Sequence, residues 1–118
     1  MTVCRAPMVP AEVMGRTTPP VIILVRPQLG ENIGAAARAM MNCGLTDLRL
    51  VAPRDGWPNP AALPMAAGGS SIIETATIYD RVADAAYDLT FLAALSVRRR
   101  GMPVRSTDPR GVIPDILA

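Results

Sequence analysis

The sequence predicts an α/β fold with a mostly parallel sheet in a three-layer arrangement. Two continuous apolar runs, Val21–Val25 and Leu89–Leu95, have the length and composition of strands buried on both faces. Between them, strand-like and helix-like segments alternate, which is typical of parallel sheets with right-handed crossovers. The 118 residues, half of them hydrophobic and 19% charged, suffice for one ordinary domain and exclude a disordered chain.

The first half of the chain is expected to form a tail, a strand, a helix and a second strand. Residues 1–20 contain four prolines and no apolar period, so we expect a flexible tail there. After the first strand and a loop, Asn32 is expected to N-cap a helix that runs to Cys43 and stops at Gly44. Asp47–Val51 is the second predicted strand.

The second half is expected to add shorter elements. Ala52–Pro60 is rich in proline and glycine and is predicted to be a loop. We expect Trp57 in this loop to pack over a strand edge, with stacking on a base as the alternative. The remaining predicted elements alternate again: a short helix Ala61–Ala67, short strands at Ile72–Ile73 and Thr77–Tyr79, a helix capped by Asp80, and the strand Leu89–Leu95.

The composition excludes several classes of site. The chain has no histidine, which removes Ser-His-Asp triads, Cys-His pairs and the usual zinc sites, so we expect no metal. Its two cysteines do not make a disulfide framework. No apolar run approaches the length of a membrane span, and because residues near the start form no continuous apolar run, we expect no secretory signal. The expected compartment is the cytoplasm.

The basic residues are all arginine. There are 12 of them, yet the net charge is only +2, which excludes a polycation that wraps DNA. Arginine's planar fork suits phosphate recognition, but the codon bias of a GC-rich genome explains the missing lysines better. The positions of the arginines therefore carry more information than their number.

One segment combines a loop, a helix start and an arginine. Leu29–Arg38 follows a predicted strand, so it lies at the carboxyl edge of the sheet, where open α/β folds bind ligands. A glycine-bearing loop that enters a helix exposes backbone N–H groups to an anion. The segment matches neither the dinucleotide-binding nor the P-loop pattern. The alternative is a helix whose alanines pack tightly on a sheet beneath an exposed arginine.

The same residues carry a family resemblance. Asn32–Met40, followed by Gly44–Val51, resembles motif 1 of the SpoU/TrmH class of SPOUT RNA methyltransferases. Further segments are similar to the TrmJ-like branch of that class: Pro53, Ala66–Ser70, Ser96–Arg98 and Asp108–Arg110.

The resemblance implies a trefoil-knotted α/β fold, S-adenosylmethionine as the methyl donor, a homodimer, and methylation of a ribose 2′-hydroxyl in RNA, most specifically in the anticodon loop of tRNA. The family's catalytic Asn and Arg fall on Asn32 and Arg38. A guanidinium is normally a charge clamp. We therefore expect Arg38 to hold an RNA phosphate rather than to act as the base.

A second set of site residues follows the last predicted strand. The resemblance implies that Leu95, Ser96 and Val97 form one wall of the donor pocket, although the family's glycine and threonine are replaced by Ala94 and Leu95. The run Arg98, Arg99 and Arg100 is expected to contact RNA phosphates at the pocket rim, with a solvated charge run as the alternative.

The family's second and third motifs are not found between Gly111 and Ala118. We therefore expect 21–118 to be the amino-terminal part of such a domain, truncated before the knot, with activity of the short chain in doubt. Two alternatives stay open: a non-catalytic RNA-binding remnant of such an enzyme, and an unrelated nucleotide-binding module.

Overall fold

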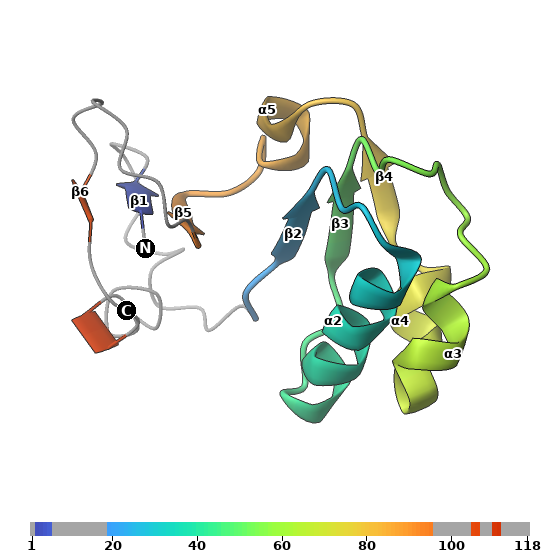
Figure 1. The fold of residues 1–118 in the computed structure, drawn as a ribbon. Coiled ribbons are helices and arrows are strands. Elements are labelled where there is room, and N and C mark those ends of the chain that lie inside the picture. The colour runs from blue at the N-terminus through green and yellow to red at the C-terminus, as the bar shows by residue number, and fades with distance from the viewer. Residues whose placement is uncertain (1, 6–18, 96–104, 107–109, 112–118) are drawn as a thin grey trace. The chain divides into compact units, whose positions relative to one another are not determined.

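The computed structural model describes residues 2–5, 19–95, 105–106 and 110–111 (Figure 1). The chain forms two compact units. One spans Pro19–Tyr87, and the other combines Met1–Thr18 with Asp88–Ala118. The larger unit carries the parallel sheet, and each unit is described by itself.

The sheet of the larger unit consists of β2 (Ile22–Val25), β3 (Leu48–Val51) and β4 (Thr77–Tyr79), in that spatial order. Both neighbouring pairs are parallel, with Val25 opposite Val51 and Val51 opposite Tyr79. All four residues of β3 are buried, as expected for a central strand covered on both faces. The predicted parallel α/β arrangement is confirmed (Figure 1).

The first connection is helix α2 (Gly30–Asn42), and its end has a clear cause. Gly44 adopts a φ of 73°, which favours glycine. The Gly44 N–H donates to the Met41 carbonyl at 3.2 Å, and the Leu45 N–H donates to the Met40 carbonyl at 2.9 Å. These two bonds form a Schellman motif and satisfy carbonyls that the helix would leave open. The predicted stop at Gly44 is therefore confirmed.

The second connection consists of three short helical segments, α3 (Ala62–Ala66), the 3₁₀ turn η1 (Ala67–Gly69) and α4 (Ser70–Glu74). The strand expected at Ile72–Ile73 is wrong, because both residues lie in α4. Their β-branched side chains are buried in the core, and tertiary packing outweighs their preference for strands.

The core lies between the sheet and these helices. Leu48 and Leu50 of β3 point to this face and are packed with buried side chains of all three helices: Ile33, Ala37, Met40, Ala62, Ala66, Ile72 and Ile73. Trp57 is half-buried and packs against the same cluster, so its predicted packing role is confirmed.

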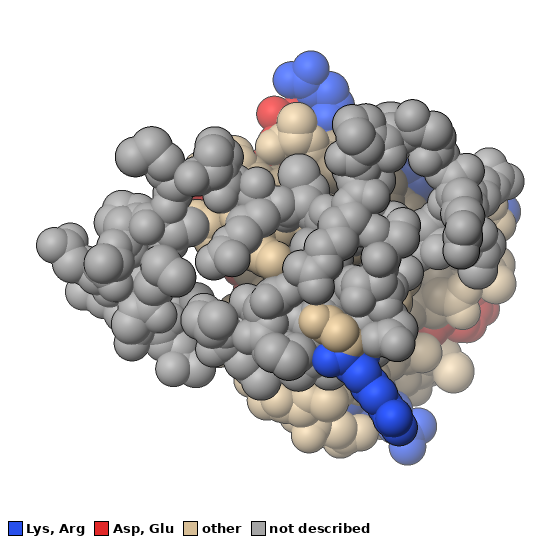
Figure 2. Space-filling model, turned by 90° about the vertical axis from the view of Figure 1, so that its left-hand side faces the viewer, with Lys and Arg blue, Asp and Glu red and all other residues tan. Residues whose placement is uncertain are grey.

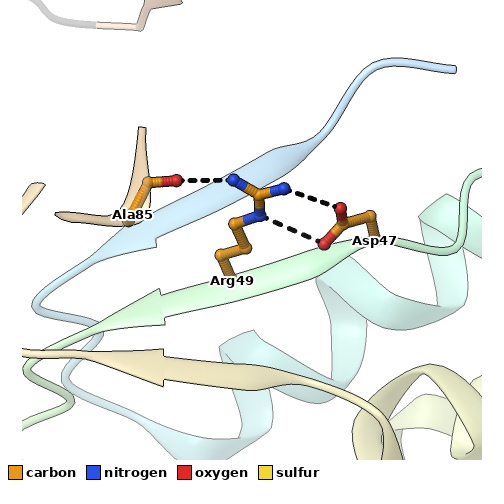
Figure 3. A network of polar contacts seen from close by, with 3 residues as sticks. All are labelled: Asp47, Arg49 and Ala85. Atoms are coloured by element: carbon orange, nitrogen blue, oxygen red, sulfur yellow. Dashed lines mark hydrogen bonds and ion pairs between the residues drawn. The ribbon is translucent and has the colours of Figure 1, made fainter. Parts of the chain in front are cut away.

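The opposite face of the sheet is covered by α5 (Val82–Ala85). Arg49, which alternates with Leu48 and Leu50 along β3, points to this face, and its Nη1 donates to the Ala85 carbonyl at 2.7 Å (Figure 3). Helices therefore lie on both faces, and the three-layer prediction is confirmed. The predicted cap is wrong, since Arg81, not Asp80, precedes α5 and no side chain caps it.

The smaller unit has a sheet of β5 (Phe91–Ala94), β1 (Thr2–Arg5) and β6 (Arg105–Ser106), in that order. Both pairs are antiparallel. The strand predicted at Leu89–Leu95 exists but is half-buried and joins this sheet, not the parallel one. β1 is not expected from the sequence, since a four-residue run beside prolines shows no measurable period. The domain boundary at residue 20 stays a prediction.

Candidate nucleic-acid interface

The candidate site is the carboxyl edge of the β2–β3–β4 sheet together with the exposed side of α2. The register places the ends of the three strands side by side, at Val25, Val51 and Tyr79. In open α/β sheets, this edge is where ligands bind. The loops that leave it contain three arginines, Arg26, Arg54 and Arg81.

The loops after β2 and β3 are built alike. Both strands end in Leu-Val-X-Pro, with Arg26 and Ala52 at the third position, and both residues have positive φ angles of 50° and 44°. Each is tied to the next strand, because the Arg26 N–H donates to the Val51 carbonyl at 2.7 Å and the Ala52 N–H donates to the Tyr79 carbonyl at 2.9 Å. The Arg54 N–H donates to the Pro27 carbonyl at 3.0 Å, which joins the two loops.

The start of α2 differs from the prediction. The N-cap is Leu29, with extended backbone and no capping side chain, so Asn32 lies within the first turn and the predicted N-cap role is wrong. A Cβ on Gly30 would lie 2.6 Å from the side-chain atoms of Asn59, so a larger residue there would require the Asn59 side chain to move. Asn59 in turn accepts the Ala61 N–H at 3.0 Å. The first residue of α2 is therefore packed against a distant loop, and no side chain caps the helix.

Asn32 and Arg38 are both exposed on α2. They are six residues apart, which is more than one and a half turns, so their side chains do not share a turn. The structure therefore places both on the accessible side of one helix without bringing them into contact.

The small residues around Arg38 on α2 are partly exposed and partly used in helix packing. Gly34 is buried, and a Cβ there would overlap the Ala62 carbonyl oxygen of α3. Gly34 therefore serves helix packing, while Ala35 and Ala39 stay exposed beside Arg38. Met41 is exposed at the end of α2.

The arginines of the described residues differ in their partners. The Arg54 guanidinium bonds the Asp55 carboxylate at 3.1 Å, and this hydrogen bond lowers the pKa of Asp55 below its ordinary value. Arg81 pairs with Asp84 at 3.3 Å. Arg26 and Arg38 form no ion pair with any described residue. In Figure 2, arginine side chains of the described residues stand out in blue on the face drawn.

Arg49 is a charged residue whose burial the sequence analysis does not anticipate. It is 7% exposed, and its Nε and Nη2 donate to the two Asp47 carboxylate oxygens at 3.3 and 3.0 Å (Figure 3). The available signal is an arginine inside an apolar strand with an aspartate two residues earlier, on the same face. The network ties β3 to α5 and has no direct place in the site.

Of the residues predicted to form the donor pocket, the structure describes only Leu95. Leu95 follows β5 in the smaller unit and is 82% exposed. It offers apolar surface that could cover an adenine ring but no side-chain hydrogen bond. Ser96, Val97, Arg98, Arg99 and Arg100 lie outside the described residues. Their predicted roles, like those of Asn32 and Arg38, stay predictions.

The described residues contain no group of three His, Cys, Asp or Glu side chains that could hold a metal ion. No helix among them is both long and apolar enough to cross a membrane.

Comparison with known sequences gives the following matches. The model of the SpoU rRNA Methylase family matches residues 19–110. The chain is 37% identical over 93 residues to the uncharacterized tRNA/rRNA methyltransferase LasT of Escherichia coli, covering 79% of this chain and 40% of LasT. It is 39% identical over 89 residues to the tRNA (cytidine/uridine-2′-O-)-methyltransferase TrmJ of Citrobacter koseri, covering 75% of this chain and 36% of that protein.

Two solved structures of methylase-type proteins are also similar to this chain. The crystal structure of TrmJ from Z. mobilis matches with a TM-score of 0.59 and 63% identity, covering 60% of this chain and 32% of that one. A methylase family protein from Neisseria gonorrhoeae matches with a TM-score of 0.68 and 33% identity, covering 81% and 53%.

The parallel α/β fold of this chain is thus similar to that of two solved proteins, one a TrmJ and one a methylase family protein. The chain belongs to the SpoU rRNA Methylase family, and the TrmJ-like resemblance of its motif is confirmed. It spans about two fifths of the length of the curated relatives that it matches.

Proposed function

We propose that this chain acts in the methylation of ribose 2′-hydroxyls in tRNA, with S-adenosylmethionine as the methyl donor. The observation that carries the proposal is Arg38, which lies at the motif position on α2, exposed and unpaired with any described carboxylate. The family membership and the names of the relatives support the reaction and the substrate. The expected setting is the cytoplasm, with a homodimer as the working form.

Arg38 is proposed to hold a phosphate next to the reacting ribose. Its guanidinium offers five N–H donors in a fixed fork and stays charged, so it binds a phosphate well and takes up a proton poorly. Asn32, in the first turn of the same helix, is proposed to hold the adjacent sugar-phosphate by its amide. Holding the RNA in this way brings the 2′-hydroxyl into position for reaction.

The donor would be bound by the residues after β5. When bound, S-adenosylmethionine supplies an electrophilic methyl group. Leu95 would cover it with apolar surface, and Ser96 and Val97 would contribute the rest of one wall. Arg98, Arg99 and Arg100 are proposed to contact RNA phosphates near that wall.

A second candidate function is RNA binding without methyl transfer. It is favoured by Ala94 and Leu95, which stand where the family has glycine and threonine, since the loss of a glycine limits close backbone approach. Donor binding separates the two candidates, because only the first requires it.

The test measures tRNA affinity and methyl transfer for the full chain and for Arg38→Ala. Unmodified tRNA is titrated over a range of salt concentrations, and labelled S-adenosylmethionine reports transfer. We expect Arg38→Ala to lower the slope of log K against log salt by about 0.7–0.9, the value of one phosphate contact. An unchanged slope contradicts the role of Arg38. Binding without transfer by the original chain assigns it to RNA binding alone.

A further inference from the structure

Strands β2 and β3 end in the same way, so a comparison of Arg26 with Ala52 shows what the Arg26 side chain adds. Arg26 and Ala52 occupy equivalent positions, one residue after the paired Val25 and Val51. Both have positive φ, and both precede a proline. A non-glycine residue with positive φ is strained, and a following proline restricts the backbone further.

Ala52 shows that this turn needs no side chain beyond a Cβ. The same turn at Arg26 nevertheless carries a long cationic side chain where glycine would be unstrained. Strain of this kind persists where surrounding structure enforces it, and it concentrates at functional sites. The backbone geometry therefore leaves the guanidinium of Arg26 unexplained.

Backbone hydrogen bonds also hold Arg26 and its neighbour in place. Its N–H bonds the Val51 carbonyl at 2.7 Å, and the carbonyl of the next residue, Pro27, accepts the Arg54 N–H at 3.0 Å. The side chain is exposed, and no described carboxylate pairs with it, whereas Arg54 and Arg81 at the same edge are tied to aspartates. An arginine on a fixed base loses less freedom when it binds an anion.

We propose that Arg26 is a positioning residue that contacts a backbone phosphate of the RNA. This inference rests on the proposed function and adds a second phosphate contact to that of Arg38. Arg26 lies at the sheet edge four residues before α2, and Arg38 lies about 12 Å along the axis from the first residue of that helix. The two cations come from different places on this strand–helix unit, and we assign them to different phosphates of one strand.

The experiment compares matched variants of the full chain. Arg26→Gly removes the strain and the cation, whereas Ala52→Gly removes the equivalent strain and no charge. Arg81→Ala removes the same formal charge from a guanidinium that already pairs with Asp84. Binding of unmodified tRNA is measured by fluorescence anisotropy over a series of salt concentrations, and Tm is measured for each variant.

We expect both glycine variants to fold and to shift Tm in the same direction, because glycine accepts a positive φ. Arg26→Gly should lower the salt slope by about 0.7–0.9 and weaken binding roughly fivefold, while Ala52→Gly leaves both unchanged. Arg26→Gly combined with Arg38→Ala should lower the slope by about twice as much.

The outcomes separate this inference from the proposed function. An Arg26→Gly slope equal to that of the original chain overturns the role of Arg26 while Arg38 can still act. An equal loss from Arg81→Ala also overturns it, since net charge alone would then explain the effect. Failure of the original chain to bind tRNA overturns both. Binding that depends on Arg26 but without methyl transfer overturns only the catalytic part of the proposed function.

Discussion

Arg49 illustrates how a charged residue is accommodated inside this fold. Arginine is rarely buried unless it is paired. Here the aliphatic stem lies within the sheet layer, and the guanidinium reaches a half-exposed Asp47 and the Ala85 carbonyl (Figure 3). The hydrogen bond from Arg49 to Ala85 joins β3 to α5, so Arg49 contributes to the stability of the fold.

Replacing Arg49 tests that role. We expect Arg49→Ala to lower the free energy of unfolding by about 2 kcal/mol, because it removes a buried stem and the donor to Ala85. The measurement is chemical denaturation. Arg49→Met keeps most of the apolar volume and should lose less, and equal losses for the two variants would show that the stem contributes little.

The pKa of Asp55 tests whether the exposed Arg54–Asp55 pair forms. Its pKa is lowered by the hydrogen bond from Arg54, so the pair is intact at neutral pH and is lost as the pH falls through that lowered pKa. In Arg54→Gln, the pKa of Asp55 should rise toward its ordinary value near 3.8. A carboxyl-carbon NMR titration measures the shift, and an unchanged pKa would contradict the contact.

Among the helices, α2 shows what the sequence predicts and what it cannot. Its apolar period and Gly44 are local signals, and both predictions hold. Its first residue, Gly30, is packed against Asn59, a residue far along the chain, and no local pattern reports such a contact. The same limit applies to α4, where burial against the core overrides two β-branched residues.

Two glycines, Gly34 within α2 and Gly44 just after its end, distinguish the cost of a steric contact from the cost of a backbone angle. Gly34→Ala places a Cβ against the Ala62 carbonyl and should cost about 2–3 kcal/mol by overpacking. Gly44→Ala meets no atom within 4 Å and should cost only about 1 kcal/mol from its positive φ. Urea unfolding compares them. A larger loss at Gly44 would contradict the close packing of α2 on α3.

Across the described chain, stability is expected to be unequal. β3 is paired on both sides and wholly buried, while β5 is only half-buried in a separate sheet. Amide hydrogen exchange should therefore be slowest in β3, intermediate in β2 and β4, and fastest in β1, β5 and β6. Protection of β5 equal to that of β3 would show that the two units open together.

The candidate site was predictable only where a motif marks it. Arg38 is identified by its place in a recognisable pattern. Arg26 is not, because its distinction is a backbone angle and the absence of a described partner, which only coordinates reveal. The sequence does contain the repeated Leu-Val-X-Pro, but the repeat acquires meaning only when the two strands are found in register.

The placement of α5 determines at which edge of this sheet a further parallel strand could be added. Strands β2, β3 and β4 lie side by side in the order of the sequence, and the helices that connect them pack on one face of the sheet. Helix α5 lies on the opposite face of the sheet. A right-handed crossover through α5 would therefore deliver any further parallel strand beside β2 rather than beside β4. With such a strand the direction of winding would reverse, and a reversal of this kind opens a crevice between diverging loops. Arg26 stands at the carboxyl end of the strand where that crevice would form.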